Sequence, residues 1–104
     1  MIRINVIKKN NIVDNIILEG HANYGDYGKD IVCAAVSATY LCTLNAILSF
    51  NEDAIEIDNT KKAQKIKIKN NDKVTLTLLD NMIRCFESLE KQYPKNINLD
   101  KEEK

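Results

Sequence analysis

One histidine and one cysteine lie near each other in the sequence and could act together as a base and a nucleophile. His21 is the only histidine of the chain, and Cys33 follows it by twelve positions. An imidazole beside a thiol can take up its proton, and the resulting thiolate can attack a carbonyl carbon. If the fold brings the two side chains together, the pair predicts acyl-transfer chemistry at a thiol.

The residues between this pair are typical of a loop that leads into a helix. Gly25 and Gly28 punctuate the segment, and Asp30 directly precedes an apolar run. Aspartate is a favoured N-cap because its carboxylate accepts hydrogen bonds from amides of the first helical turn. Cys33 would then lie at the positive end of the helix dipole, which stabilises a thiolate. We expect the two glycines to be hinges of a loop that closes over substrate, and the Cys33 amide to be an oxyanion donor.

Each of these residues also has an ordinary structural interpretation. Asp30 could cap the helix without touching the histidine, and Gly25 and Gly28 could only supply positive φ angles in a turn. Ser37 lies one helical turn after Cys33. Its hydroxyl could face the thiolate or bond back to a backbone carbonyl.

The donor atoms around the histidine do not form a metal-binding motif. His21, Cys33 and either Asp26 or Asp30 offer nitrogen, sulfur and oxygen ligands. A zinc site usually has four protein ligands in a recognisable spacing, and a fourth ligand is missing here. We therefore expect neither a metal ion nor another cofactor.

The composition favours a small soluble protein. A chain of 104 residues suffices for one packed core, so we expect a single domain over residues 1–104. The 15 basic residues balance the 15 acidic ones, which argues against direct binding of nucleic acid. The alternating segment after Met1 does not resemble a signal peptide, and three cysteines are an odd number. We expect reduced thiols, a cytoplasmic protein, and structural roles for Cys42 and Cys85.

The run from Ile31 to Phe50 has no charged residue and is about as long as a membrane-spanning helix. Polar residues interrupt it, and a central Asn45 would be unfavourable in lipid. We therefore expect a buried helix of a soluble protein, with no membrane contact. Helical spacing places Cys33 and Ser37 on one stripe with Leu41, Leu44 and Leu48, which predicts a thiol at the mouth of the core.

Two pairs of alternating segments predict two β-hairpins. Residues 2–9 and 12–21 alternate between apolar and polar side chains on either side of a turn at Asn10 and Asn11. Residues 53–59 and 63–70 alternate in the same way. Their isoleucines should face one another across the second hairpin.

The last third of the chain predicts a second helix and a further strand. From about Val74, apolar residues recur at helical spacing until Pro94. The tail could add a short edge strand through Ile97 and Leu99 before its charged end frays. The expected fold is an α+β two-layer sandwich in the order ββαββα(β), with two helices on a mostly antiparallel sheet of four or five strands.

The stretch from Glu19 to Ala38 resembles the signature of a known protease family. "EGHANYGDYGKDIVCAAVSA" is similar, almost residue for residue, to the motif of the ribosomal-processing cysteine protease family Prp: GHA, a glycine loop, and then GxDIVCAAVS. In length and order of elements the resemblance extends over nearly the whole chain.

This resemblance implies a homodimeric α+β enzyme with a peptide substrate. Members of the family remove the N-terminal extension of large-subunit ribosomal protein twenty-seven by cutting after a pair of phenylalanines. The match implies Cys33 as the nucleophile and His21 as the base. It also implies Asp30 and Ser37 as the other polar positions of the motif.

A second interpretation is a non-catalytic ribosome-associated or protein-binding module with an inert loop. It predicts an ordinary thiol at Cys33 and no proteolysis. The enzyme interpretation predicts that Cys33 reacts far ahead of Cys42 and Cys85.

Overall fold

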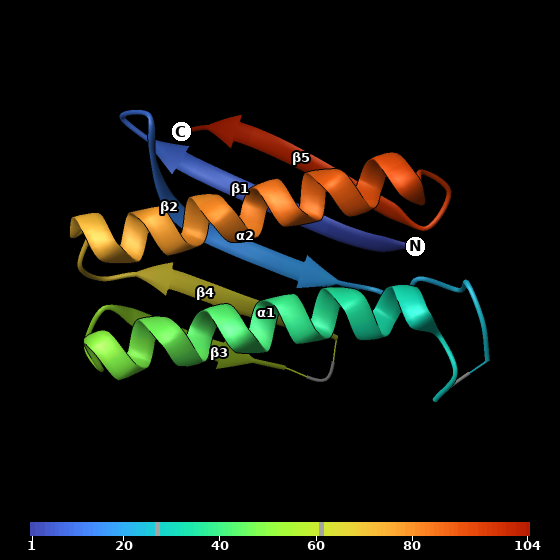
Figure 1. The fold of residues 1–104 in the computed structure, drawn as a ribbon. Coiled ribbons are helices and arrows are strands. Elements are labelled where there is room, and N and C mark those ends of the chain that lie inside the picture. Colours follow the sequence, from blue (N-terminus) through green and yellow to red (C-terminus); the bar gives the residue numbers. More distant parts are fainter. Residues whose placement is uncertain (27, 61) are drawn as a thin grey trace.

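The computed structural model describes residues 1–26, 28–60 and 62–104 as one sheet covered on one face by two helices (Figure 1). The element order is ββαββαβ, and the α+β prediction is confirmed. The sheet has five strands in the order β3-β4-β2-β1-β5. The elements are β1 (Ile2–Lys9), β2 (Ile12–Glu19), α1 (Ile31–Phe50), β3 (Ile55–Asn59), β4 (Ala63–Ile68), α2 (Lys73–Gln92) and β5 (Ile97–Glu103).

Both predicted hairpins are confirmed. The turn between β1 and β2 has Asn10 at φ 54° and Asn11 at φ 66°. Asparagine tolerates these positive angles, which match the right-handed twist of a tight hairpin. In the second hairpin, Ile55 lies opposite Ile68, and Ile57 lies opposite Ile66.

The last strand is longer than the sequence predicts. β5 runs to Glu103 and pairs in parallel with β1, from Ile2 opposite Ile97 to Lys8 opposite Glu103. Lys104 N also donates to Lys8 O at 2.7 Å. The expectation of a fraying tail is therefore wrong, because backbone pairing with β1 stabilises a segment whose side chains are mostly charged.

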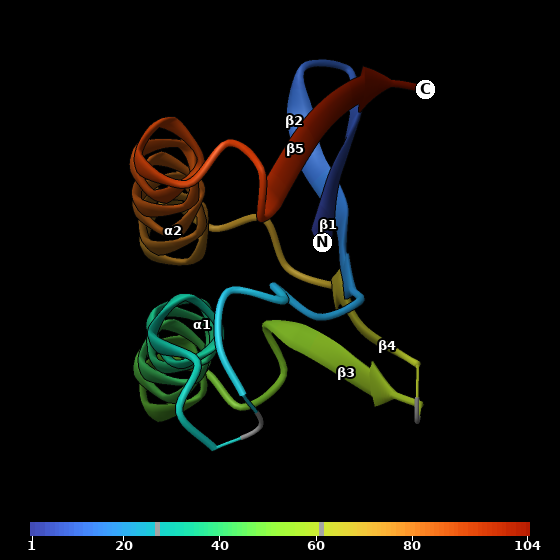
Figure 2. The same ribbon diagram turned by 90° about the vertical axis from the view of Figure 1, so that its right-hand side faces the viewer.

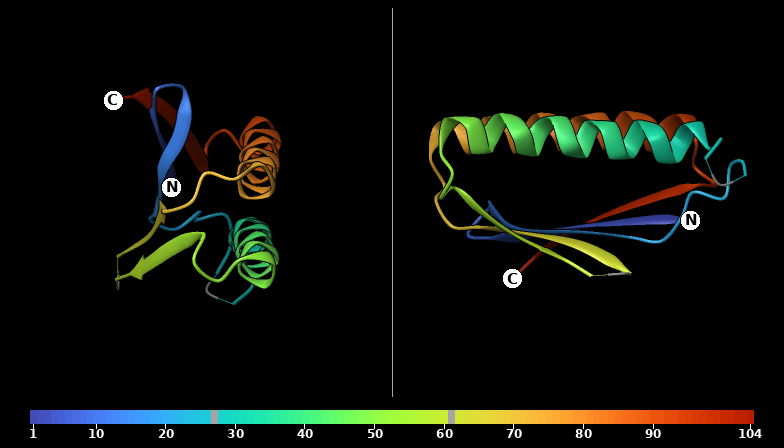
Figure 3. Two further views of the ribbon diagram at one scale, coloured as in Figure 1. Left: turned by 90° about the vertical axis from the view of Figure 1, so that its left-hand side faces the viewer. Right: turned by 90° about the horizontal axis from the view of Figure 1, so that it is seen from below.

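The core lies between the sheet and the helix layer. Viewed from the side, α1 and α2 lie next to each other over one face of the sheet, and the opposite face is left open (Figures 2 and 3). The apolar side chains of the strands point toward the helices because side chains alternate along a strand. The largest fully buried ones include Phe86, Ile4, Ile16, Ile47, Ile66, Leu79, Met82 and Ile97.

Only one face of α1 is buried. The buried residues are Val32, Val36, Tyr40, Leu44 and Ile47. The predicted core stripe is wrong at Leu41, because that side chain is 57% exposed, whereas Leu44 is buried.

The exposed side of α1 has no charged residue and includes large apolar side chains. Ile31 and Phe50, at the two ends of the helix, are 56% and 58% exposed. By length and composition α1 would suffice to cross a membrane. Here, however, it lies along the sheet and contacts α2, as a core helix of a layered domain does (Figure 1).

Candidate active site

The loop that carries the histidine leaves the sheet at a position that requires glycine. Gly20 directly follows β2 and has φ +88°. A Cβ atom at this position would lie 2.3 Å from the carbonyl oxygen of Met1. No other residue fits such a close backbone approach at a positive φ. The sequence analysis missed Gly20, although a glycine directly before the only histidine was a visible signal.

Asp30 caps α1 and also holds the preceding loop. Its Oδ1 accepts hydrogen bonds from Val32 N and Cys33 N, both at 3.0 Å. Its Oδ2 accepts from Tyr24 N at 2.9 Å and Gly25 N at 3.2 Å. These amides, that of Cys33 foremost, hold the pKa of the carboxyl below its ordinary value. The predicted cap is confirmed, and its second oxygen ties the loop to the helix.

This cap changes the expectation for the oxyanion hole. The Cys33 N–H donates to Asp30 and is therefore not free to receive a substrate oxygen. Oxyanion donors must point at the position where the negative charge develops. The assignment of the Cys33 amide as such a donor does not agree with this structure.

The thiol of Cys33 lies against the start of the loop. The side chain is half-buried, and Sγ accepts a hydrogen bond from Ala22 N at 3.4 Å. Ala22 is 1% exposed, whereas His21, one residue earlier, is exposed to solvent. The fold thus brings the segment that carries the histidine to the sulfur, across eleven positions of sequence.

A turn from the far end of the chain supports this loop. Asn96 Nδ2, between α2 and β5, donates to Ala22 O at 2.8 Å. The rings of Tyr24 and Tyr93 meet edge to face, with centroids 5.3 Å apart. These contacts could not be found by reading the motif, because Asn96 and Ala22 are 74 positions apart.

The other predicted residues take different positions. Ser37 is exposed on α1. Gly28 has φ +82° with open space around its Cα, but Gly25 has no positive φ and lies close to the Lys29 and Asp30 backbone. Asp26 is exposed, with its carbonyl oxygen bonded to Lys29 N at 2.8 Å. Among the residues that the structure describes, no three of the histidine, cysteine and acidic side chains cluster as a metal site would require.

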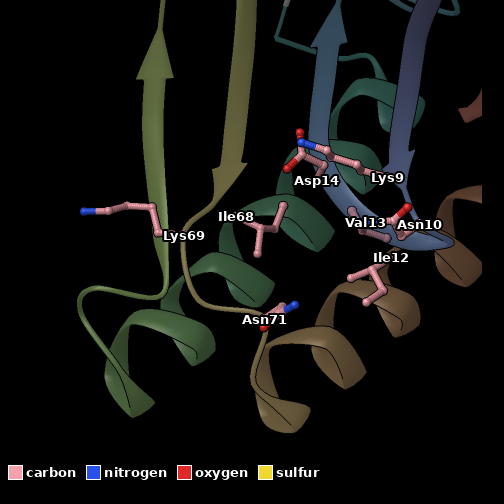
Figure 4. Close-up of a pocket in the computed structure, with 8 residues that line it drawn as sticks. All are labelled: Lys9, Asn10, Ile12, Val13, Asp14, Ile68, Lys69 and Asn71. Atoms are coloured by element: carbon pink, nitrogen blue, oxygen red, sulfur yellow. The ribbon is translucent and has the colours of Figure 1, made fainter. Parts of the chain in front are cut away.

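The remaining thiols and a cavity at the other end of β2 lie away from this loop. Cys42 is exposed rather than part of the core, and Cys85 is half-buried. A cavity of about 280 Å³ opens where β2 begins, whereas His21 follows the end of β2 (Figure 4). None of its lining residues is a predicted site residue: Lys9, Asn10, Ile12, Val13, Asp14, Ile68, Lys69 and Asn71.

The α+β sandwich thus holds a thiol in the first turn of a capped helix, against the residue that follows an exposed histidine, and a cysteine protease needs both a thiol and a histidine. The comparison with protein families agrees. The sequence model of the family described as cysteine protease Prp matches residues 1–98, and the chain belongs to this family. The protein is therefore a cysteine protease.

Similar proteins support the same assignment. The ribosomal processing cysteine protease Prp of Staphylococcus aureus is 34% identical over 91 residues, covering 84% of this chain and 85% of the relative. A crystal structure of Prp from S. aureus with a covalently linked product peptide has a TM-score of 0.91 at 28% identity, covering 97% and 99% of the two chains. A further structure of that protein, with a substrate peptide, has a TM-score of 0.84 at the same identity and coverage.

Proposed function

We propose that this protease processes a ribosomal protein, with Cys33 as nucleophile and His21 as base. The observation that carries the proposal is the contact between Cys33 Sγ and the Ala22 amide, which places the thiol beside the residue that follows His21. Relatives described as ribosomal processing proteases add support. The proposed substrate is the N-terminal extension of large-subunit ribosomal protein twenty-seven, cut after a pair of phenylalanines.

The proposed reaction is acyl transfer in two steps. His21 takes the proton of Cys33, and the thiolate attacks the scissile carbonyl carbon to form a thioester as the C–N bond breaks. His21 returns the proton to the leaving amine. Water, deprotonated by His21, then hydrolyses the thioester and restores the thiol.

Three further roles belong to the loop and the helix. Asp30 holds the first turn of α1 and the Tyr24 and Gly25 amides in one arrangement, which supports a positioning role rather than direct contact with the reacting atoms. Gly28, with its positive φ and open surroundings, is suited to be a hinge. Ser37 is proposed to contact the bound peptide, since its side chain is exposed one turn beyond the nucleophile.

We further propose a cytoplasmic homodimer. Helix α1 has no charged residue, and Ile31, Leu41 and Phe50 along it are each exposed by more than half of their surface. Exposed apolar side chains on an uncharged helix favour contact with another protein surface, and a second copy offers the same uncharged helix. The three unpaired thiols are in keeping with a reducing compartment.

The test is cleavage of a synthetic peptide that spans the proposed processing site, followed by mass spectrometry. We expect a single cut after the two phenylalanines by the wild-type protein and by Cys85→Ala on α2, which serves as a matched control. Replacing the phenylalanine pair by alanines should abolish the cut. Cleavage elsewhere, or equal cleavage of the alanine peptide, would refute the substrate assignment. No cleavage of any peptide would favour the non-catalytic module.

A further inference from the structure

The turn between α2 and β5 reaches the nucleophile through one residue of the loop. Asn96 Nδ2 donates to the carbonyl oxygen of Ala22 at 2.8 Å. The N–H of the same residue, Ala22, donates to Cys33 Sγ at 3.4 Å. Both polar backbone groups of Ala22 are thus engaged, one by Asn96 and the other by the thiol.

Asn96 is itself held firmly by its backbone. Its N–H donates to Tyr93 O at 3.0 Å, at the end of α2. Its carbonyl oxygen accepts from Ile2 N at 2.8 Å, at the start of β1. The amide side chain therefore projects from a point fixed by a helix and a strand, and these backbone bonds do not depend on which side chain is present.

The direction of the Ala22 N–H matters for the chemistry of the sulfur. A hydrogen bond to an ionised acceptor is stronger than one to a neutral acceptor, so this amide favours the thiolate over the thiol. The Ala22 N–H keeps its direction only if the backbone at Ala22 does not rotate. A hydrogen bond to the Ala22 carbonyl restrains this rotation. His21 is the preceding residue, so the same restraint limits where the imidazole can lie.

We propose that Asn96 is a positioning residue for the nucleophile: by holding the Ala22 carbonyl, it keeps the Ala22 N–H directed at Cys33 Sγ. The consequence for turnover rests on the proposed function, in which Cys33 attacks the substrate. Among the residues that the structure describes, the Asn96 side chain has this one hydrogen-bond partner. Its effect should therefore reach the rest of the protein mainly through Ala22.

Alkylation of Cys33 tests the proposal without any substrate. The protein is treated with iodoacetamide at pH values from 5 to 9, and the extent of labelling is measured by peptide mass spectrometry. The variants are Asn96→Ala and Asn96→Asp. The control is Asn98→Ala, at an exposed position two residues further on. Cys42, which is exposed on α1, serves as an internal reference within each sample. Melting temperatures are recorded for each variant.

In Asn96→Ala we expect iodoacetamide to label Cys33 about threefold to tenfold more slowly at pH 6 than in the wild-type protein, as the loss of one hydrogen bond implies. The pH profile of Cys33 labelling should move upward while that of Cys42 stays in place. Asn96→Asp keeps the size of the side chain but loses its donor, so it should be at least as slow. In Asn98→Ala, Cys33 should be labelled at the wild-type rate. In peptide cleavage, the Asn96 variants should lower kcat with little change in KM.

A wild-type labelling profile in folded Asn96→Asp or Asn96→Ala would overturn the positioning role. That result would stand whether or not the peptide is cut, because labelling requires no turnover. If the wild-type protein cleaves no peptide but the Asn96 variants still slow Cys33 labelling, the proposed function fails and the positioning role is retained.

Discussion

The two helices have the same length and the same type of cap, yet the two caps bond to different parts of the chain. Each spans 20 residues and begins after an aspartate N-cap. Asp72 bonds within its own helix, to the backbone and hydroxyl of Thr75. Asp30 bonds to its own helix and also to amides of the preceding loop. The difference indicates that a common capping device becomes functional when it also fixes a second segment.

The outward faces of the helices differ as well. α2 has charged residues on its solvent side, and its Glu87 forms an ion pair with Lys101 at 3.4 Å. α1 exposes apolar side chains and has no charge at all. An uncharged helix with large exposed apolar side chains favours a second partner, whereas an amphipathic helix is stabilised by one core and water.

Replacing Cys33 of α1 and Cys85 of α2 in turn should give the largest contrast in activity. We expect Cys33→Ala and His21→Ala each to lower peptide cleavage by about a thousandfold or more, with little further loss in the double variant, because nucleophile and base act as a unit. Cys85→Ala, on α2, should retain most of the activity. The measurement is kcat/KM for the spanning peptide. Substantial turnover by Cys33→Ala would contradict the assignment of the nucleophile.

A charge on the outward face should separate the helices by their effect on assembly. We expect Leu41→Arg on α1 to halve the molar mass measured by light scattering after size-exclusion chromatography, because an unpaired charge in an apolar interface is strongly unfavourable. Val74→Arg, at a partly exposed apolar position of α2, should leave the mass unchanged. A wild-type protein that runs as a monomer at micromolar concentration would refute the homodimer.

Substitution of the two caps should have different effects on activity. Both substitutions should change the pH dependence of stability in the same direction. Both carboxyls have a pKa below the ordinary 3.8, chiefly because of the Cys33 amide for Asp30 and the Thr75 amide for Asp72. Their stabilisation is fully present above the ordinary value and is lost as the pH falls through the folded value. Asp30→Asn and Asp72→Asn should therefore each lower the melting temperature at pH 7 and flatten its decline in acid.

Of the two cap variants, only the Asp30 variant should also slow catalysis, because Asp30, unlike Asp72, holds the loop beside Cys33. Kinetics at pH 7 and thermal melts between pH 2 and pH 7 provide both readouts. An equal loss of activity in Asp72→Asn would mean that activity follows general stability rather than the loop.

The same comparison explains what could be predicted from the sequence. The buried face of α2, which includes Leu79, Met82 and Phe86, follows from its periodicity because polar residues mark the opposite side. In α1 both faces are apolar, so the pattern could not decide between the Leu41 side and the Tyr40 side. Local rules therefore predicted the extent of α1 and its cap but not its orientation.

Contacts that depend on packing were beyond the sequence analysis. The motif between His21 and Ser37 predicted the loop and a candidate nucleophile because these residues are near in sequence. The bond from Asn96 to Ala22 and the parallel pairing of β5 with β1 join opposite ends of the chain. Such contacts arise only once the sheet is assembled, and no periodic pattern signals them.

The most direct test of the central claim is the relative reactivity of the three thiols in the native protein. By exposure alone Cys42 should react first, since Cys33 and Cys85 are half-buried. If the helix start, the Ala22 amide and His21 activate Cys33, brief iodoacetamide treatment near pH 6 should label Cys33 well ahead of both others. His21→Ala should slow that labelling and move its pH profile upward. Labelling led by Cys42, or a Cys33 rate that is unchanged in His21→Ala, would contradict the account.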